Sequence, residues 1–201
     1  MRMNLLFPTL VGDVVNPDPT LNARLAEVIR ERQRSDIDQA PYTTVHGGWQ
    51  SGLDLLRSDA PAILQLRSFF EEQIGAYLTE AGRCHNTPGA PTRFAFDYTG
   101  WAVVLGPGGF QHEHVHAGTQ VVGVYWVAVP DEPAGRGDLN LGDPRGGRVA
   151  SRLGWETDRI RLVPEAGRLI LFPSYLPHRV EQVTGAGVRI SINFDVTIHP
   201  T

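Results

Sequence analysis

The 201-residue sequence contains a single cysteine, Cys84, and no lysine. One cysteine cannot close an internal disulfide or build a cysteine-rich zinc site, which favours a reducing compartment and predicts a cytoplasmic protein. All 18 basic residues are arginines, spread along the chain without a cluster, and the formal net charge is −4. An acidic chain without a basic patch is not typical of a nucleic-acid-binding protein, so we expect no nucleic-acid partner.

Long apolar runs are missing as well. The apolar stretch at the start is interrupted by Pro8, Gly12 and Asp13, and no later run approaches the roughly 18 residues that a membrane-spanning helix needs. We therefore expect neither a secretion signal nor a membrane anchor. The sequence also has no Walker loop, no G-x-S-x-G elbow and no dinucleotide-binding glycine spacing, which argues against these common catalytic templates.

The composition is apolar and rich in turn formers. Hydrophobic residues make up 41% of the chain and charged residues 20%, with 22 glycines and 15 prolines. Such a chain is too apolar to be disordered and too rich in turns for a helical bundle. A chain of this length buries about 70% of the surface of its unfolded form. We expect one domain over residues 1–201, dominated by β-structure.

Two helices are predicted in the first half of the chain. Apolar residues recur at helical spacing over 21–34 and again over 60–80, where Gly82 is expected to end the second helix. A proline-containing apolar run at 5–11 is typical of an edge strand. The glycine-rich segment 45–51 is predicted to be a loop.

From Thr92 onward the apolar period changes to two residues, which indicates strands. Turn signals such as Gly106–Gly109 separate the apolar segments at short intervals. Two helices followed by seven or eight short strands predict a mainly β fold, a jelly roll with the N-terminal helices packed on one sheet. The predicted strands cover 94–98, 101–105, 121–129, 138–141, 160–163, 169–172, 178–183 and 188–198.

Four histidines carry the first chemical signal. His112, His114 and His116 alternate along one segment, and His178 follows on a later strand. Residues two apart on a strand share a face, so His114 and His116 can bind one ion, and a distant third histidine would complete a facial set of ligands. The pair of His112 and His114 satisfies the same spacing. Alternating histidines on a solvated strand end are the structural alternative.

A polar row near the C-terminus carries the second signal. Strand alternation places Arg189, Ser191, Asn193 and Asp195 on one face and apolar residues on the other. A guanidinium binds a carboxylate through two parallel hydrogen bonds, and Ser191 can add a third donor. The alternative is an arginine on a solvated face, paired with Asp195.

The order of these features resembles the 2-oxoglutarate and Fe(II) dependent oxygenases of the double-stranded β-helix class, a fold shared with cupins. The likeness rests on the H-x-H segment, the strand 123–127, the segment 164–174, His178 and the Arg189-x-Ser191 pattern. It extends to the motifs at 6–9, 48–51 and 142–145, and so to nearly the whole chain.

The resemblance implies a dioxygenase that decarboxylates 2-oxoglutarate to succinate and oxidises a C–H bond of a second substrate with molecular oxygen. It implies Fe(II) bound by His114, His116 and His178, which would be the catalytic metal site. Arg189 and Ser191 would then hold the far carboxylate of 2-oxoglutarate. Tyr125 is expected to contact the cofactor, whereas Trp49 is equally suited to a lid or to packing.

The chain departs from the common pattern at one ligand. Most members of the superfamily use two histidines and one carboxylate, but His116 occupies the carboxylate position, and Glu113 should point to the opposite face of the strand. Replacing a carboxylate by a neutral imidazole raises the charge of the metal site by one, which favours an anionic co-substrate.

Two other functions fit part of the pattern. One is a three-histidine cupin-type dioxygenase that needs no 2-oxoglutarate, although the cupin spacing fails at Gln120 and Tyr175. The other is a jelly roll whose histidines bind metal without catalysis. The sequence does not identify the primary substrate, a small molecule in the simplest case, and it leaves the oligomeric state open, a homodimer included.

Overall fold

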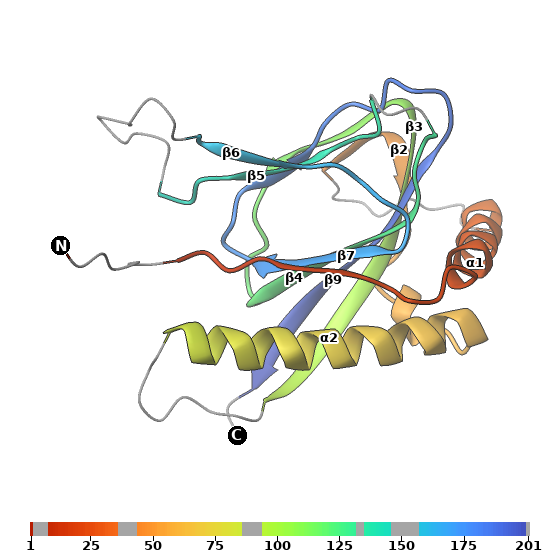
Figure 1. The fold of residues 1–201 in the computed structure, drawn as a ribbon. Helices are drawn as coiled ribbons and strands as arrows, with labels where there is room; N and C mark the ends of the chain where they lie inside the picture. The colour runs from red at the N-terminus through yellow and green to blue at the C-terminus, as the bar shows by residue number, and fades with distance from the viewer. Residues whose placement is uncertain (2–7, 36–43, 86–93, 132–134, 146–156, 200–201) are drawn as a thin grey trace.

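A curled antiparallel sheet forms the body of the molecule, and two helices lie against it (Figure 1). This computed structural model describes residues 1, 8–35, 44–85, 94–131, 135–145 and 157–199. Within these residues the sheet has nine strands, in the order β1-β7-β4-β9-β3-β8-β5-β6, with β2 paired to β3. The strands are β1 (Gly12–Val15), β2 (Val45–Gln50), β3 (Ala95–His114), β4 (Val121–Ala128), β5 (Leu139–Gly142), β6 (Arg159–Leu162), β7 (Arg168–Pro173), β8 (His178–Val180) and β9 (Arg189–His199).

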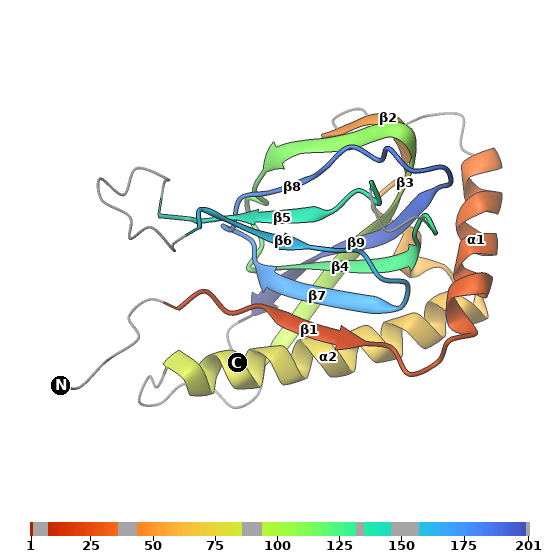
Figure 2. The ribbon, with the colours of Figure 1, turned by 45° about the horizontal axis from the view of Figure 1, so that its top comes forward.

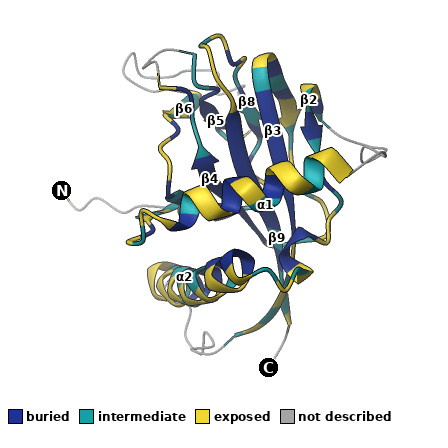
Figure 3. Ribbon diagram, turned by 90° about the vertical axis from the view of Figure 1, so that its right-hand side faces the viewer, coloured by how far each residue is buried: buried dark blue, intermediate teal, exposed yellow. Residues whose placement is uncertain are grey.

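The helices cover one face of this sheet. α1 (Leu21–Ser35) and α2 (Pro61–His85), with the short 3₁₀ turn η1 (Leu55–Arg57) between them, pack their apolar sides onto it (Figure 2). Buried and exposed positions alternate along α1, as expected for an amphipathic helix at a surface (Figure 3). Neither helix in the described part of the chain has the length and hydrophobicity needed to cross a bilayer.

Two separate cores lie on opposite faces of the curled sheet. Successive side chains of a strand point to opposite faces of the sheet. On β9, Ile190, Ile192 and Phe194 face the helices. On β4, Val122 and Val124 face the inside of the curl. The second, inner core surrounds the region where the histidines lie. The predicted mainly β fold with N-terminal helices on one sheet is therefore confirmed.

Several predicted elements differ from the observed ones. The first strand lies at Gly12–Val15 rather than at 5–11, where residues 8–11 form no strand and the remainder falls outside the described residues. The second helix continues past Gly82 to His85. Gly82 is not among the glycines with positive φ, so it does not adopt the left-handed conformation that ends many helices.

The glycine-rich segment predicted as a loop is strand β2. It pairs with β3, and a Cβ added at Gly48 would lie 2.6 Å from Leu105 Cδ2. Glycine is needed there because the two strands approach closely, not because the chain turns. Trp49 is 6% exposed and belongs to the core between sheet and helices, so its role is packing rather than that of a lid.

Strand β3 is longer than predicted and includes the glycines expected to form a turn. Its register against β2 shifts between His46 and Gly48, opposite Gly106–Gly109. The glycines form an irregularity within a continuous strand, and Gly108 has a φ of 88°. The strand therefore reaches His114 without a break.

Candidate metal centre

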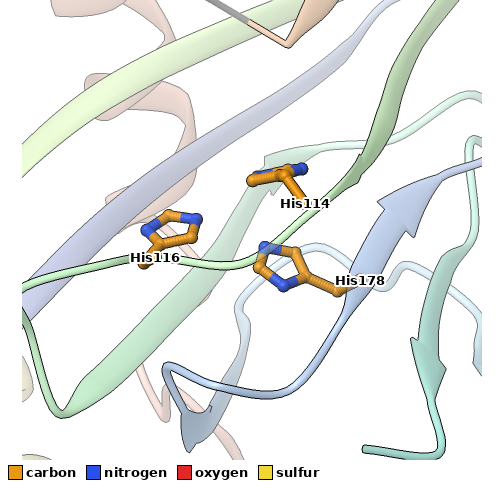
Figure 4. Close-up of side chains that lie close together, drawn as sticks. All are labelled: His114, His116 and His178. Atoms are coloured by element: carbon orange, nitrogen blue, oxygen red, sulfur yellow. The ribbon is translucent and has the colours of Figure 1, made fainter. Parts of the chain in front are cut away.

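Three histidines, two on adjacent strands and one just beyond the end of β3, meet inside the curl. His114 ends β3 and pairs with His178 at the start of β8, and His116 follows two residues later. Figure 4 shows the three rings gathered around a common space. Ring centroids are 4.3 Å apart for His114 and His178, and 5.1 Å apart for His116 and either of the others. One ligand atom of each residue lies within 4.8 Å of the other two.

A register shift in β3 sets which residues face inward. Gln111 pairs with Val180 and His114 with His178, so three steps along β3 correspond to two along β8. An extra residue of this kind is a β-bulge, and bulges commonly redirect side chains next to functional sites. As a result the side chains of both Gln111 and His114 line the inner cavity.

The two residues in the bulge point outward. His112 is exposed and its ring lies 4.3 Å from that of His46 and 5.1 Å from that of Phe110. Glu113 is also exposed and forms an ion pair with Arg159. The predicted outward direction of Glu113 is confirmed, and the alternative pair of His112 and His114 does not come together around His178.

In each of the three rings, Nδ1 faces a hydrogen-bond acceptor of the protein. Nδ1 of His114 lies 2.7 Å from the His112 carbonyl oxygen, and Nδ1 of His178 lies 2.9 Å from the Leu176 carbonyl oxygen. Nδ1 of His116 lies 2.6 Å from Oδ1 of Asp195. Because each acceptor needs a proton on Nδ1, every Nε2 is left with its lone pair, the form that binds a metal ion.

Burial disfavours the charged form of two of the rings, His114 and His178. It lowers the pKa of His178 to about 3, with a smaller effect in the same direction from His114. Burial also lowers the pKa of His114, despite the hydrogen bond to His112. Protons therefore compete little with a metal for these two nitrogens at neutral pH.

The residues fit a divalent metal ion. Nε2 of His116 is buried without a hydrogen-bond partner among the described residues, a costly state that a bound cation would relieve. In a facial set of ligands, two nitrogens that each lie about 2.1 Å from one ion are about 3 Å apart. The ligand atoms of the three histidines lie within 4.8 Å of one another, so the rings must move closer together to bind one ion.

Arg189 lies in the same cavity, entirely buried. Its Nε donates to the Gly137 carbonyl oxygen at 3.1 Å and its Nη1 to Oγ of Ser191 at 3.0 Å. Nη2 has no partner among the described residues. Burial lowers the pKa of Arg189 to about 10, against the weaker opposing effect of Asp138. The guanidinium is still charged at neutral pH.

Further unused donors lie around Arg189. Nδ2 of Asn193, which lines the cavity, and Nε1 of Trp126 are both buried without a partner in the described part of the chain. The Arg189 guanidinium lies 5.9 Å from the centre of the Trp126 ring. The cavity itself measures about 20 Å³ and is completed by Gln111, Trp101 and aliphatic side chains of β4, β5 and β8.

Tyr125 does not belong to this cavity. Its hydroxyl donates to Oδ1 of Asn22 at 2.7 Å, and its ring packs against Phe69 and Phe70 of α2. The prediction that Tyr125 contacts the cofactor is wrong, because strand alternation turns it toward the helices and turns Trp126 toward Arg189. The continuous apolar run of β4 gives no sequence signal that distinguishes the two faces of this strand.

Comparison with known proteins shows the fold and a family to which part of the chain is similar. The family described as "Putative 2OG-Fe(II) oxygenase" matches residues 99–195, whereas no match was found among curated proteins. A prolyl-4-hydroxylase from Pseudomonas putida is 19% identical, with a TM-score of 0.66 over 94% of this chain and 93% of that one.

Two other solved structures have a similar fold. A prolyl hydroxylase from Trichoplax adhaerens, in complex with a hypoxia inducible factor peptide, is 16% identical, with a TM-score of 0.66 over 93% of this chain and 83% of that one. The non-heme alpha ketoglutarate dependent epimerase SnoN from nogalamycin biosynthesis is 13% identical, with a TM-score of 0.65 over 93% and 77%. The matched residues contain the three histidines and the Arg189 row, so this part of the chain is similar to the family of putative 2OG-Fe(II) oxygenases.

Proposed function

We propose that this protein is an oxygenase that binds Fe(II) through His114, His116 and His178 and binds 2-oxoglutarate through Arg189. The observation that carries the proposal is a fully buried arginine, charged and with one unused Nη2, in the same cavity as the three histidines. A buried cation that no carboxylate of the described residues contacts through a hydrogen bond is costly. An anionic ligand that reaches this cavity would offset the cost, which favours a carboxylate.

The groups around Arg189 suit one end of a dicarboxylate. Nη2 of Arg189 and Nδ2 of Asn193 are unused donors, and the hydroxyl of Ser191 is already held against the guanidinium. A carboxylate accepts several such hydrogen bonds, and charge-assisted ones are about twice as strong as neutral ones. The other, 2-oxo acid end of the molecule would then point toward the histidines.

The residues of the cavity would bind the metal ion, fix the orientation of the imidazole rings and exclude water. The three Nε2 atoms would hold the ion, and their Nδ1 hydrogen bonds keep the rings from rotating. Bound Fe(II), together with 2-oxoglutarate and oxygen, supplies the oxidative chemistry that converts 2-oxoglutarate to succinate and oxidises a C–H bond of the substrate. The inner core keeps bulk water away from this reaction.

Binding requires the cavity to widen. A volume of about 20 Å³ is near that of a single water site, so a five-carbon acid must displace some of the side chains that line the cavity. We therefore expect near-ultraviolet circular dichroism of Trp101, which lines the cavity, to change when 2-oxoglutarate is added to the metal-loaded protein.

Equilibrium binding with matched variants tests the proposal. Calorimetry with Mn(II) and then 2-oxoglutarate should show both binding to the wild type. His178→Ala should lose the metal, and Arg189→Met should keep the metal and lose 2-oxoglutarate. Arg168→Met is the control, since Arg168 lies 5.9 Å from the same Trp126 ring but pairs with Asp13 outside the cavity.

Two results would overturn the assignment. Tight metal binding by His178→Ala would exclude His178 as a ligand. Metal binding by the wild type without any binding of 2-oxoglutarate would instead favour a three-histidine dioxygenase of the cupin type, in which Arg189 binds a carboxylate of the substrate itself.

A further inference from the structure

The three histidines differ in what accepts their Nδ1 protons. His114 and His178 donate to backbone carbonyl oxygens, whereas His116 donates to the carboxylate of Asp195 at 2.6 Å. Among the described residues, His116 is the side chain to which Asp195 is hydrogen-bonded. Only the His116 ring, of these three, is thus hydrogen-bonded to a negatively charged group.

The fold holds Asp195 and His116 together from both sides. Asp195 lies on β9 and continues the row that begins with Arg189. The segment after β3 that carries His116 is fixed by the His116 amide, which donates to the Ser174 carbonyl at 3.1 Å. The His116 ring also stacks on Trp101, with centroids 5.8 Å apart and planes 19° apart. The contact is therefore built into the sheet rather than made by two free side chains.

The charge of the cluster makes this contact significant. A site with two histidines and one carboxylate contributes one negative charge to a divalent ion. The group of possible ligands in the described part of the chain contains three histidines and no carboxylate. Neutral imidazoles alone leave the full charge of the ion uncompensated in a buried region.

We propose that Asp195 is a positioning residue that supplies, through His116, the negative charge which a ligating carboxylate would supply directly. The proposal rests on the three-histidine metal site proposed above. Hydrogen bonding to a carboxylate fixes the imidazole tautomer and makes the ring a stronger donor to the metal. The carboxylate also stabilises the ion electrostatically, and more so when the ion has the higher charge.

The side chains of His116 and Asp195 are 11% and 28% exposed, respectively. Screening by salt is therefore weaker than for a surface pair. Outer-shell partners of this kind typically contribute 10- to 100-fold to metal affinity, so we expect about that loss of affinity when the carboxylate is removed.

A second Asp–His pair, between β3 and β9, provides the control. Asp97 on β3 contacts His199 on β9 at 2.8 Å, and both side chains are well exposed. Asp97→Asn removes the same charge from the same sheet but leaves the three-histidine cluster unchanged. A difference between Asp195→Asn and Asp97→Asn therefore reports the connection to the cluster and not the change in net charge.

The experiment measures Co(II) affinity by competition and the Fe(III)/Fe(II) reduction potential in the full-length protein. Asp195→Asn should bind Co(II) about 10- to 100-fold more weakly than the wild type and should raise the potential. Asp97→Asn should leave both unchanged. Asp195→Glu, which restores the charge, should recover part of the lost affinity.

A double-mutant cycle sharpens the test. In His116→Asp the negative charge sits on the candidate ligand itself, so adding Asp195→Asn should no longer weaken Co(II) binding. Equal losses in both backgrounds would overturn the proposal, as would wild-type affinity and potential in Asp195→Asn. If His178→Ala binds Co(II) like the wild type, the metal site itself is wrong, which distinguishes that failure from a failure of the Asp195 proposal.

Discussion

The buried imidazole of His178 should make the metal-free protein sensitive to acid, and leucine at this position should remove that sensitivity. Burial and the neighbouring His114 lower the pKa of His178 from 6.5 to about 3 in the folded state. In the unfolded chain the solvated ring titrates near its ordinary value of about 6.5. Between these two values the unfolded state binds more protons, so the free energy of unfolding decreases as the pH falls.

The size of the effect follows from the two pKa values. Each pH unit below about 6.5 removes about 1.4 kcal/mol from the free energy of unfolding, until His178 protonates in the folded state as well. At about pH 4.5 the loss is about 2.7 kcal/mol, and it reaches about 4.4 kcal/mol at about pH 3. Leucine binds no proton, so His178→Leu escapes this loss. The hydrogen bond from His178 to Leu176 is missing from the variant at every pH, so it does not affect the pH-dependent difference.

Urea unfolding in the presence of a chelator measures this difference. Between about pH 7.5 and about pH 4.5, the free energy of unfolding of His178→Leu relative to the wild type should rise by about 2.7 kcal/mol. Val180→Ala is the control, because Val180 is buried on the same strand and carries no titratable group. A relative stability of His178→Leu that stays constant over this range would refute the reasoning.

Three further substitutions give definite expectations. Arg189→Met removes a buried cation but leaves a carbonyl oxygen and a hydroxyl without their donor, so the free energy of unfolding should change by less than about 2 kcal/mol in urea titrations. A loss well above that would contradict the finding that Nη2 of Arg189 has no partner among the described residues. Tyr125→Phe loses the bond to Asn22 and about 1 kcal/mol of stability, and a change in 2-oxoglutarate affinity would contradict its position outside the cavity. Gly123→Ala would bring a Cβ into the ring of Phe194, so chemical unfolding should show a loss of about 1–3 kcal/mol, and wild-type stability would contradict the packing.

Local periodicity was enough to predict the features that depend on neighbours in sequence. Alternation along β9 correctly separated Arg189 and Ser191 from Ile190 and Ile192, because a strand turns successive side chains to opposite faces whatever surrounds it. The same rule predicted that Glu113 would point away from His114, whereas the bulge turns His112 outward as well. The two helices followed from apolar spacing, although the end of the second did not.

Other features depend on contacts between distant segments and left no local signal. The continuous apolar run in β4 is buried on both faces, so its sequence does not say that Tyr125 faces the helices and Trp126 faces the inner core. Segment 45–51 looks like a loop until β3 lies beside it. The partnership of Asp195 with His116 spans 79 residues of sequence and requires the register of the whole sheet.

The most direct test of a metal and a co-substrate sharing one cavity is an anaerobic titration of the Fe(II)-loaded protein with 2-oxoglutarate, followed by visible absorption. A 2-oxo acid that chelates Fe(II) produces a weak charge-transfer band. The band should appear with the wild type, saturate at one equivalent, and be absent in Arg189→Met that has bound Fe(II). Iron binding without a band in the wild type, or an undiminished band in Arg189→Met, would contradict the proposed site.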